Sequence, residues 1–574
     1  MESTGNSSSI PSKTLILIAL LQGFALLLLH QAIEFRHWPH NEPHWLFGFY
    51  SVAVATPVML LLGLSEHSKP VYKWAGIFTT VIFGLGYYVG HQAIPLEHIR
   101  FETLLFLFVA TLCVATFKAL MYVQHFAAGG PLTYSRLFLL SWRNFLTLGL
   151  SLLFMLCTWG VLMLWAGLFK AIKINFFYDL FTEKWFYYPV LALAHGFGVI
   201  IFRFQSGVID TITRIQQAMM KFLLVILSLV SVIFLFALPF AGLAPLWETG
   251  GSSLILWMQA LMLFSINAVY QDEPESQPYH LWVHRFICIG VALLPIYSAI
   301  SFYGLSLRVE QYGWSVSRCW ALLLWSVFAA FSIGYLWGIL KLKDHWLRQL
   351  SWINVRMGLV VLGLMLLVNS PLLDFRKISV NSQIDRLKQG VVSRENFDFR
   401  YLRNELARPG YEALQVLREE VKAEHPEIAL RIQSYYADKD DKRSTSKSDF
   451  VKAITGLTED TPEDLIDAIY VEVTKRIWQM QQTQSYELLV LDLNNDGDLE
   501  YVFAQVRQRE IELAMYHNID GRWESRVLRS IYGQSTTSKE SNARLLEALE
   551  KREYGAAANE WQFLQIGEHL FQVL

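Results

Sequence analysis

Long apolar segments separated by short polar ones fill the first two thirds of the chain. Each segment holds about 20 residues, the length that a helix needs to cross the hydrocarbon core of a bilayer. The pattern predicts eleven transmembrane helices, and ten or twelve remain open because the third and sixth segments are short or contain glycine. The predicted spans are Thr14–Ile33, Leu46–Leu64, Lys73–Gly90, Thr103–Tyr122, Leu146–Leu168, Tyr188–Phe204, Phe222–Gly242, Ser252–Tyr270, Phe286–Gly304, Cys319–Leu340 and Met357–Leu373.

Lysine and arginine in the short connections predict the orientation, because these residues concentrate on the cytoplasmic side. They are about twice as frequent on one side as on the other if residues 1–13 are cytoplasmic. The polar start and the long first apolar segment favour a retained signal anchor. An odd number of spans then predicts that the chain leaves the membrane on the periplasmic side of a bacterial inner membrane.

Composition agrees with a membrane protein. Charged residues make up 17% of the 574 residues and hydrophobic residues 53%, whereas soluble domains carry about 25% charged residues. The net charge of -2 gives no reason to expect a nucleic-acid partner. The four cysteines all fall in apolar segments, with no paired spacing, which argues against a disulfide scaffold and a zinc site.

The last third of the chain has a different character, because 34 of the 50 acidic residues follow Asp374. We predict a helical juxtamembrane segment at 374–436, including a helix over Phe399–Glu424 that breaks at Pro409-Gly410. An exposed loop at 437–449 and an α+β domain at 450–574 follow. That domain is predicted to contain a helix from Thr461 to Trp478, then alternating strands at Tyr486–Leu491, Tyr501–Arg507, Ile511–His517 and Arg522–Leu528, and a hairpin at Gly567. The fold class is thus a polytopic α-helical membrane protein with a C-terminal soluble α+β domain.

The sharpest motif lies between two of the predicted strands. Oxygen-bearing side chains alternate along this loop, with a glycine where a sharp turn is needed, a pattern that suits Ca²⁺. The predicted ligands are Asp492, Asn494, Asp496, Asp498 (through its backbone carbonyl) and Glu500. The position at which an EF-hand places its bidentate glutamate is Phe503, and the flanks are strands. The motif therefore resembles the calcium loops of integrin-type β repeats, and the alternative is a polar hairpin that binds nothing.

Ionisable and polar side chains within the spans are few, and such residues are candidates for function because they are costly to bury in lipid. The candidates are His195, Arg203 and Asn267. We expect His195 to be a packed, hydrogen-bonded residue rather than a proton relay, and Asn267 to hydrogen-bond between helices. Lys118 and Arg203 are expected near span ends, where they can extend to the interface. The absence of a mid-span carboxylate weakens a proton- or sodium-coupled transporter.

Two outer loops add candidates. Arg308, Glu310 and Tyr312 form a compact polar group in the loop predicted after the ninth span; a structural ion pair is the simpler interpretation and a membrane-surface enzyme site the alternative. The aromatic segment at Phe176–Tyr188 is typical of an interfacial belt, with a lipid-binding or partner-binding lip as the alternative. The chain has no nucleotide-binding or hydrolase motif, so the catalytic residues, if any, are unknown.

Three segments resemble a family of bacterial membrane proteins, the domain of unknown function 4153. They are Ser306–Arg318, Pro371–Leu387 and Phe397–Leu414, and the segment from His195 to Arg203 fits as well. The resemblance implies a multi-span membrane region that leads into a soluble C-terminal part, in which an acidic Asp/Gly loop is often present. No activity is established for the family, so the resemblance implies no mechanism.

Three functions fit the sequence. The first is an inner-membrane protein that anchors a periplasmic domain for recognition of an envelope protein, glycan or other ligand, with Ca²⁺ as a structural cofactor. The second is a transporter or lipid flippase with an accessory domain, in which the glycine-rich sixth span would be a flexible helix. The third is a membrane-surface enzyme acting on lipid-linked glycans, with Arg308 and Glu310 at its site. The first is preferred because the tail is large and holds the one motif suited to a metal.

Overall fold

The chain divides into two compact units, Met1–Ile432 and Gln433–Leu574, and each is described by itself. The computed structural model describes residues 12–64, 68–243, 251–270, 278–394, 396–423, 425–436, 447–458, 461–475, 483–493, 497, 499–507, 511–519, 522–528, 548, 551, 564–566 and 569–571.

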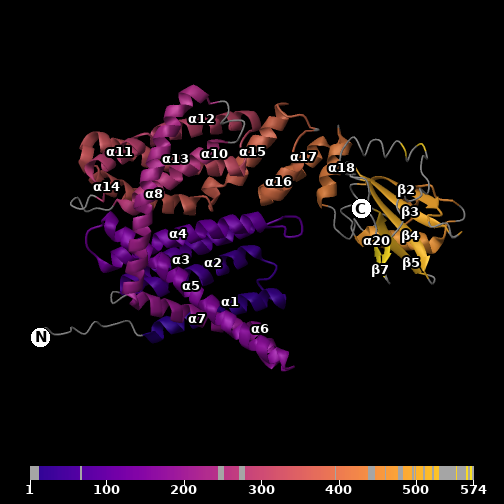
Figure 1. Cartoon of the computed structure of the whole chain (residues 1–574), viewed down its shortest axis with the longest axis horizontal. Coiled ribbons are helices and arrows are strands. Elements are labelled where there is room, and N and C mark those ends of the chain that lie inside the picture. Colours follow the sequence, from indigo (N-terminus) through magenta and orange to yellow (C-terminus); the bar gives the residue numbers. More distant parts are fainter. Residues whose placement is uncertain are drawn as a thin grey trace. The chain divides into compact units, whose positions relative to one another are not determined.

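The first unit is a bundle of long helices (Figure 1). Its helices are α1 (Ser12–Glu34), α2 (Pro43–Gly63), α3 (Ser68–His91), α4 (Glu102–Ala128), α5 (Tyr134–Ala171), α6 (Phe176–Thr182), α7 (Lys184–Phe204), α8 (Ser206–Ala241), α10 (Gly251–Val269), α11 (Leu281–Ala292), α12 (Leu294–Tyr312), α13 (Val316–Leu342) and α14 (Leu347–Leu367), with short 3-10 turns η1 (Lys343–His345) and η2 (Pro371–Leu373).

Every predicted span overlaps a helix of this bundle, and the ninth, Phe286–Gly304, crosses from α11 into α12. Within the described residues, nine helices are long and apolar enough to cross a membrane, and α11 and α12 together form one of these nine. The two remaining predicted spans are α10, whose apolar part covers Ser253–Val269, and α3, which has 24 residues but is not among the nine. The chain is therefore an integral membrane protein of the polytopic helical class.

Several boundaries differ from the predictions. Helices α5 and α8, for example, begin at Tyr134 and Ser206, well before the predicted starts at Leu146 and Phe222. Helix α14 begins at Leu347, ten residues before the predicted start, because arginines can lie within a helix that is otherwise apolar. The guanidinium of Arg356, for example, lies 3.7 Å from the ring centroid of Trp352. Helix α4 continues to Ala128, so Lys118 lies about 15 Å before its end rather than near it. The aromatic outer segment is not a loop either, since it contains α6 and the first turn of α7.

Two large apolar cores lie within the described part of the bundle. One core joins α1, α2, α3, α4 and α7 around residues such as Met59, Val71 and Leu120. The other joins α8 and α10 to α14 around residues such as Ile287 and Trp346. Helices α4 and α14 connect the two, because the Tyr122 hydroxyl donates a 2.7 Å hydrogen bond to the Val355 carbonyl.

The first unit continues past the last span into α15 (Phe375–Lys388), α16 (Phe399–Glu405) and α17 (Ala407–Val421), which we call the collar. The predicted break at Pro409-Gly410 is wrong, since both residues lie in the first turn of α17 and the chain turns at Leu406 instead. Proline is tolerated in a first turn because the amide that it lacks has no partner there. Helix α18 (Pro426–Tyr436) follows.

The second unit consists of a sheet and helices α19 (Lys447–Lys452) and α20 (Glu463–Lys475). Its five-stranded sheet runs in the order β1 (Ile454–Thr455), β2 (Thr483–Leu491), β3 (Glu500–Arg507), β4 (Ile511–Ile519) and β5 (Arg522–Leu528). Strand β1 is parallel to β2, and the other neighbours are antiparallel. Strands β6 (Leu564–Ile566) and β7 (His569–Phe571) form a separate antiparallel pair.

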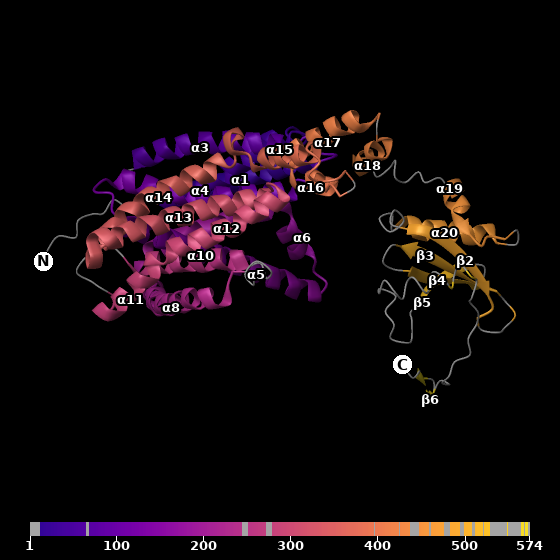
Figure 2. The ribbon, with the colours of Figure 1, turned by 90° about the horizontal axis from the view of Figure 1, so that it is seen from above.

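Helix α20 lies beside the sheet (Figure 2). The helix and one face of the sheet share an apolar core, which includes Phe450, Leu465, Ile469 and Phe503. The four main strands lie where alternation predicted them, within three residues. Residues 447–449 of the predicted loop belong to α19, because its helix begins at Lys447. The predicted hairpin turns at Asp520-Gly521 and Gly567, the rest of the loop (437–446) and the end of the predicted helix at Trp478 lie outside the described residues.

Candidate functional site

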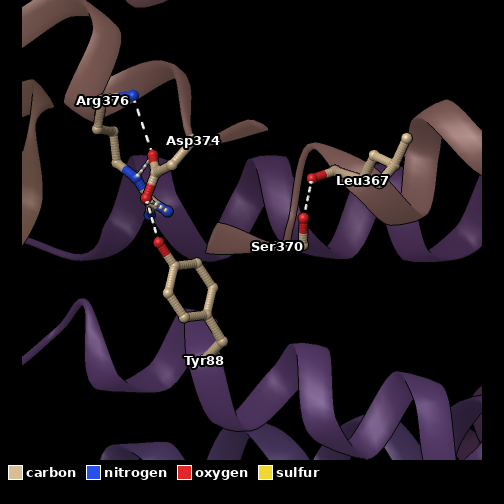
Figure 3. A network of polar contacts seen from close by, with 5 residues as sticks. All are labelled: Tyr88, Leu367, Ser370, Asp374 and Arg376. Atoms are coloured by element: carbon tan, nitrogen blue, oxygen red, sulfur yellow. Dashed lines mark hydrogen bonds and ion pairs between the residues drawn. The ribbon is translucent and has the colours of Figure 1, made fainter. Parts of the chain in front are cut away.

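A network of buried polar side chains lies where the collar begins (Figure 3). Asp374 is the N-cap of α15, and its Oδ1 accepts hydrogen bonds from the Arg376 amide at 3.0 Å and from Arg376 Nε at 2.7 Å. Arg376 Nη2 donates to Asp374 Oδ2 at 2.8 Å, so the ion pair is bidentate. From α3, the Tyr88 hydroxyl donates to the same Oδ2 at 2.8 Å.

Both charges of this pair are buried, with Asp374 4% exposed and Arg376 8% exposed. Burial by itself raises the pKa of the Asp374 carboxyl, but the hydrogen bonds and charge of Arg376, together with the Tyr88 hydroxyl, outweigh it and lower the pKa. The carboxylate therefore stays ionised, with its oxygens occupied by donors. We call this cluster of Tyr88, Asp374 and Arg376 the latch, because it joins the start of the collar to α3.

A second group of contacts joins α15 to the connection between α12 and α13. The Trp314 amide donates to Ser382 Oγ at 2.9 Å, and Gln383 Nε2 donates to the Trp314 carbonyl at 2.9 Å. From α16, the Tyr401 hydroxyl accepts from the Val316 amide at 2.9 Å. Burial raises the pKa of Tyr401, so this phenol remains neutral. The first turn of α13 is thus capped by collar side chains as well as by its own Ser315.

Arginines cap the C-terminal end of α12, where free carbonyls carry partial negative charge. Arg386 of the collar donates to the carbonyls of Glu310 and Gln311 at 3.1 and 2.6 Å. Arg318 donates to the Gly313 carbonyl at 2.8 Å and lies 5.4 Å from the ring centroid of Tyr312.

The predicted outer-loop group of Arg308, Glu310 and Tyr312 is therefore not in a loop, because all three residues lie in the last turns of α12. All three side chains are exposed. Glu310 contacts the collar through its backbone carbonyl, which accepts a hydrogen bond from Arg386. These residues are thus brought together with the collar rather than with a separate polar pocket.

Helix α17 makes a third contact with the bundle, at the connection after α3. The Arg408 amide donates to the Gln92 carbonyl at 3.0 Å, and Arg408 Nη1 lies 2.9 Å from His91 Nε2. The rings of Tyr411 and His98 stack with their centroids 5.7 Å apart. These polar contacts of the collar thus involve the end of α3, the connection after it, or the connection after α12 and the helix turns that flank that connection.

These contacts agree with one another topologically. Two spans, α13 and α14, separate the connection at Gly313–Ser315 from the collar, and eight predicted spans separate the connection after α3 from it. An even number of crossings returns a chain to the same face of a bilayer. The collar therefore closes on connections that the eleven-span scheme places on one face, as an even number of spans after α3 requires.

The predicted membrane residues lie on α7 and α10, whereas the latch joins α3 to α15. Arg203, at the end of α7, donates to the carbonyls of Leu61 at 2.9 Å and of Leu64, so it caps α2. His195 is buried at 6% exposure, but its Nε2 has no hydrogen-bond partner within the described chain, contrary to the expected hydrogen-bonded histidine. Asn267 on α10 accepts at Oδ1 from Asn354 Nδ2 at 2.6 Å, which links α10 to α14.

Only part of the predicted calcium loop is described. Its position is as expected, between β2 and β3, where Leu491 pairs with Glu500. The Gly497 amide donates to Asp492 Oδ2 at 3.1 Å, and Gly497 has φ of 93°, a conformation that favours glycine. Glu500 is buried and accepts from the Leu493 amide at 2.7 Å. Asn494, Asp496 and Asp498 lie outside the described residues, and among the described ones no His, Cys, Asp or Glu group could hold a metal.

The latch was not among the predicted site residues. Asp374 and Arg376 stand two residues apart after a proline-containing turn, a spacing that could have indicated an N-cap with a bidentate partner. Tyr88 carries no such signal, since 286 residues separate it from Asp374 in the chain.

Comparisons with known proteins give a family and no further relative. No curated protein and no solved structure matches the chain. The family model described as Domain of unknown function (DUF4153) matches residues 41–417, about two thirds of the chain, from the start of α2 into α17. The match thus includes the latch and nearly all of the collar, and it ends before the second unit. The chain belongs to the DUF4153 family.

Proposed function

We propose that this protein is a bacterial inner-membrane anchor, whose helical bundle holds the C-terminal α+β domain on the periplasmic side for recognition of an envelope protein or glycan. The single observation that carries the proposal is the collar, which fastens the outgoing chain to the bundle through the buried latch. A linker that only connected two independent parts would not require a buried ion pair. The collar instead makes the exit of the chain from the membrane rigid.

The orientation follows from the excess of lysine and arginine in the connections on the opposite face. The connections that meet the collar belong to the other face, and the proposal assigns that face to the periplasm.

Protease added to intact spheroplasts tests the side of the C-terminal domain. We expect the protease to remove an epitope placed after Leu574 while a cytoplasmic marker stays intact. The control is the same digestion after lysis, which establishes that the domain can be cleaved. An epitope that survives in intact spheroplasts and disappears after lysis would place the domain in the cytoplasm and contradict the proposal.

We further propose that Ca²⁺ stiffens the loop between β2 and β3. The support is that Gly497 turns where the motif requires it and that Asp492 and Glu500 approach from the two strands. Calorimetric titration of the detergent-solubilised full chain with Ca²⁺ is expected to release heat that Asp492→Ala abolishes. The control is Glu524→Ala, which removes an exposed carboxylate from β5. Absence of heat in the unaltered protein would remove the metal from the proposal.

A further inference from the structure

The second half of the bundle contains a buried glutamine that joins three helices. Gln259 on α10 is 0% exposed. Its Nε2 donates to Ser298 Oγ on α12 at 2.5 Å and to Ser332 Oγ on α13 at 2.8 Å. Burying an uncharged amide in an apolar interior costs free energy unless each of its polar atoms has a hydrogen-bond partner.

Not every atom has one. Gln259 Oε1 has no hydrogen-bond partner within the described chain, and the same holds for Ser301 Oγ, one turn from Ser298 on α12. Ser301 is 1% exposed. Exchanging the nitrogen and oxygen of the Gln259 amide would only move the missing partner to the other atom. Ser231 on α8 repeats the pattern, since its Oγ is unpartnered while its carbonyl accepts from Tyr297, the neighbour of Ser298.

The polar side chains continue along the same helices toward the other end of the bundle. Asn267 lies eight residues after Gln259 on α10, and Tyr335 lies three residues after Ser332 on α13, so each pair shares one helix face. Tyr335 Oη lies 2.9 Å from Asn267 Oδ1 and 2.5 Å from Asn354 Oδ1. Two groups of polar side chains thus follow one another along α10 and α13, with members on α12 and α14, and we call this series the column.

The column ends near a native cysteine. The Tyr270 hydroxyl lies 2.9 Å from His284 Nδ1, and Cys288 Sγ lies 3.6 Å from His284 Nε2. Tyr270 and Tyr335 both pack against Trp346, with ring centroids 5.6 and 5.9 Å apart. This end of the column thus contacts the triad of Asn267, Tyr335 and Asn354 through a shared tryptophan.

We propose that this column, from Ser301 through Gln259 to the triad and Cys288, binds a chain of internal water molecules and forms a hydrated track within the second half of the bundle. Water supplies both donors and acceptors, and buried waters occur where two to four protein polar groups lack partners. The alternative is a dry interface in which the polar groups only hold helices together. A dry interface leaves the oxygens of Gln259, Ser301 and Ser231 without partners. The proposal goes beyond the anchoring function and does not depend on the side of the C-terminal domain.

Thiol labelling of the full chain in native membranes distinguishes the two cases, because methanethiosulfonate ethylammonium reacts with thiolate, which forms in water and not in lipid. Ser301→Cys and Ser332→Cys are introduced singly after the four native cysteines are replaced by alanine. The matched controls are Phe302→Cys and Ile333→Cys, since these neighbours lie at the same depth and are 44% and 60% exposed on the lipid-facing side. We expect the column positions to react at least about tenfold faster than their controls.

A third probe requires no substitution in the column. In a chain that keeps only Cys288, which is buried, the native thiol is expected to react faster than Phe302→Cys. Size-exclusion profiles identify any serine variant that fails to fold, and Cys288 then decides the outcome. Column thiols that react no faster than the lipid-facing controls would overturn the hydrated track and establish a dry interface.

Discussion

Replacing Asp374 with alanine is expected to lower the free energy of unfolding of the membrane unit by about 3–5 kcal/mol, the range for breaking a buried ion pair. The reason is that the guanidinium of Arg376, which is 8% exposed, keeps its charge but loses its two hydrogen bonds to the carboxylate, and the Arg376 amide loses its own. The Tyr88 hydroxyl loses its acceptor as well. Denaturant titration of the full chain in micelles measures the change, with unfolding monitored by proteolytic cleavage within the collar.

The control for this prediction is an exposed ion pair of the same collar. Lys388 Nζ lies 3.2 Å from Glu420 Oε1, with about half of each side chain exposed. Exposed pairs contribute about 0–1 kcal/mol, so Glu420→Gln is expected to leave the unfolding midpoint nearly unchanged. A second variant, Asp374→Leu combined with Arg376→Met, removes both charges and should recover much of the loss. If Asp374→Ala had no larger effect than Glu420→Gln, the latch would not fasten the collar.

The latch also predicts a dependence on pH. The pKa of Asp374 is lower in the folded protein than in the unfolded chain, where it is about 3.9. Its stabilising contribution is therefore fully present above the unfolded pKa and is lost as the pH falls through the folded pKa. The collar should remain closed throughout the neutral and mildly acidic range, so the latch acts as a fixed joint there.

The sequence predicted the membrane helices because an apolar run of the right length has few other stable structures in a bilayer. It predicted their ends less well, since residues such as Arg356 and Lys118 can lie inside a helix when their alkyl chains pack and their charged groups find an aromatic ring or a polar edge. Periodicity contains no information on such contacts.

Contacts between distant segments could not be predicted from the sequence at all. Arg408 and His91 are 317 residues apart, and each is unremarkable in its local sequence. The same is true of Gln259 and its partners Ser298 and Ser332, which lie in three different apolar helices. The predicted site residues were those with an unusual local pattern, whereas the structure concentrates its buried polar groups where helices meet.

The strands of the second unit were predicted more accurately. One face of the sheet packs against the core below α20 and the other carries a second apolar cluster, so side chains along each strand point alternately to one cluster and to the other. Phe503 is informative in this respect. An EF-hand would place a metal-binding glutamate at this position of the acidic motif, and the structure instead makes Phe503 part of the core, with 1% exposure. A calcium loop of the strand-flanked kind therefore requires no ligand from it.

Phe503→Ala is accordingly expected to destabilise the second unit by about 3–5 kcal/mol, through lost apolar burial and the cavity left behind. The ring of Phe503 stacks on Tyr486 with centroids 5.7 Å apart and lies 6.2 Å from that of Phe450, so its removal leaves the core between sheet and helices incomplete. The control is Val527→Ala on β5, a residue that is 57% exposed and should change the stability by no more than about 0.5 kcal/mol. Proteolysis of the full chain across a urea gradient, read by an epitope after Leu574, measures both variants. Equal urea midpoints for the two variants would mean that Phe503 is not in the core, and the arrangement of α20 over the sheet would then have to be abandoned.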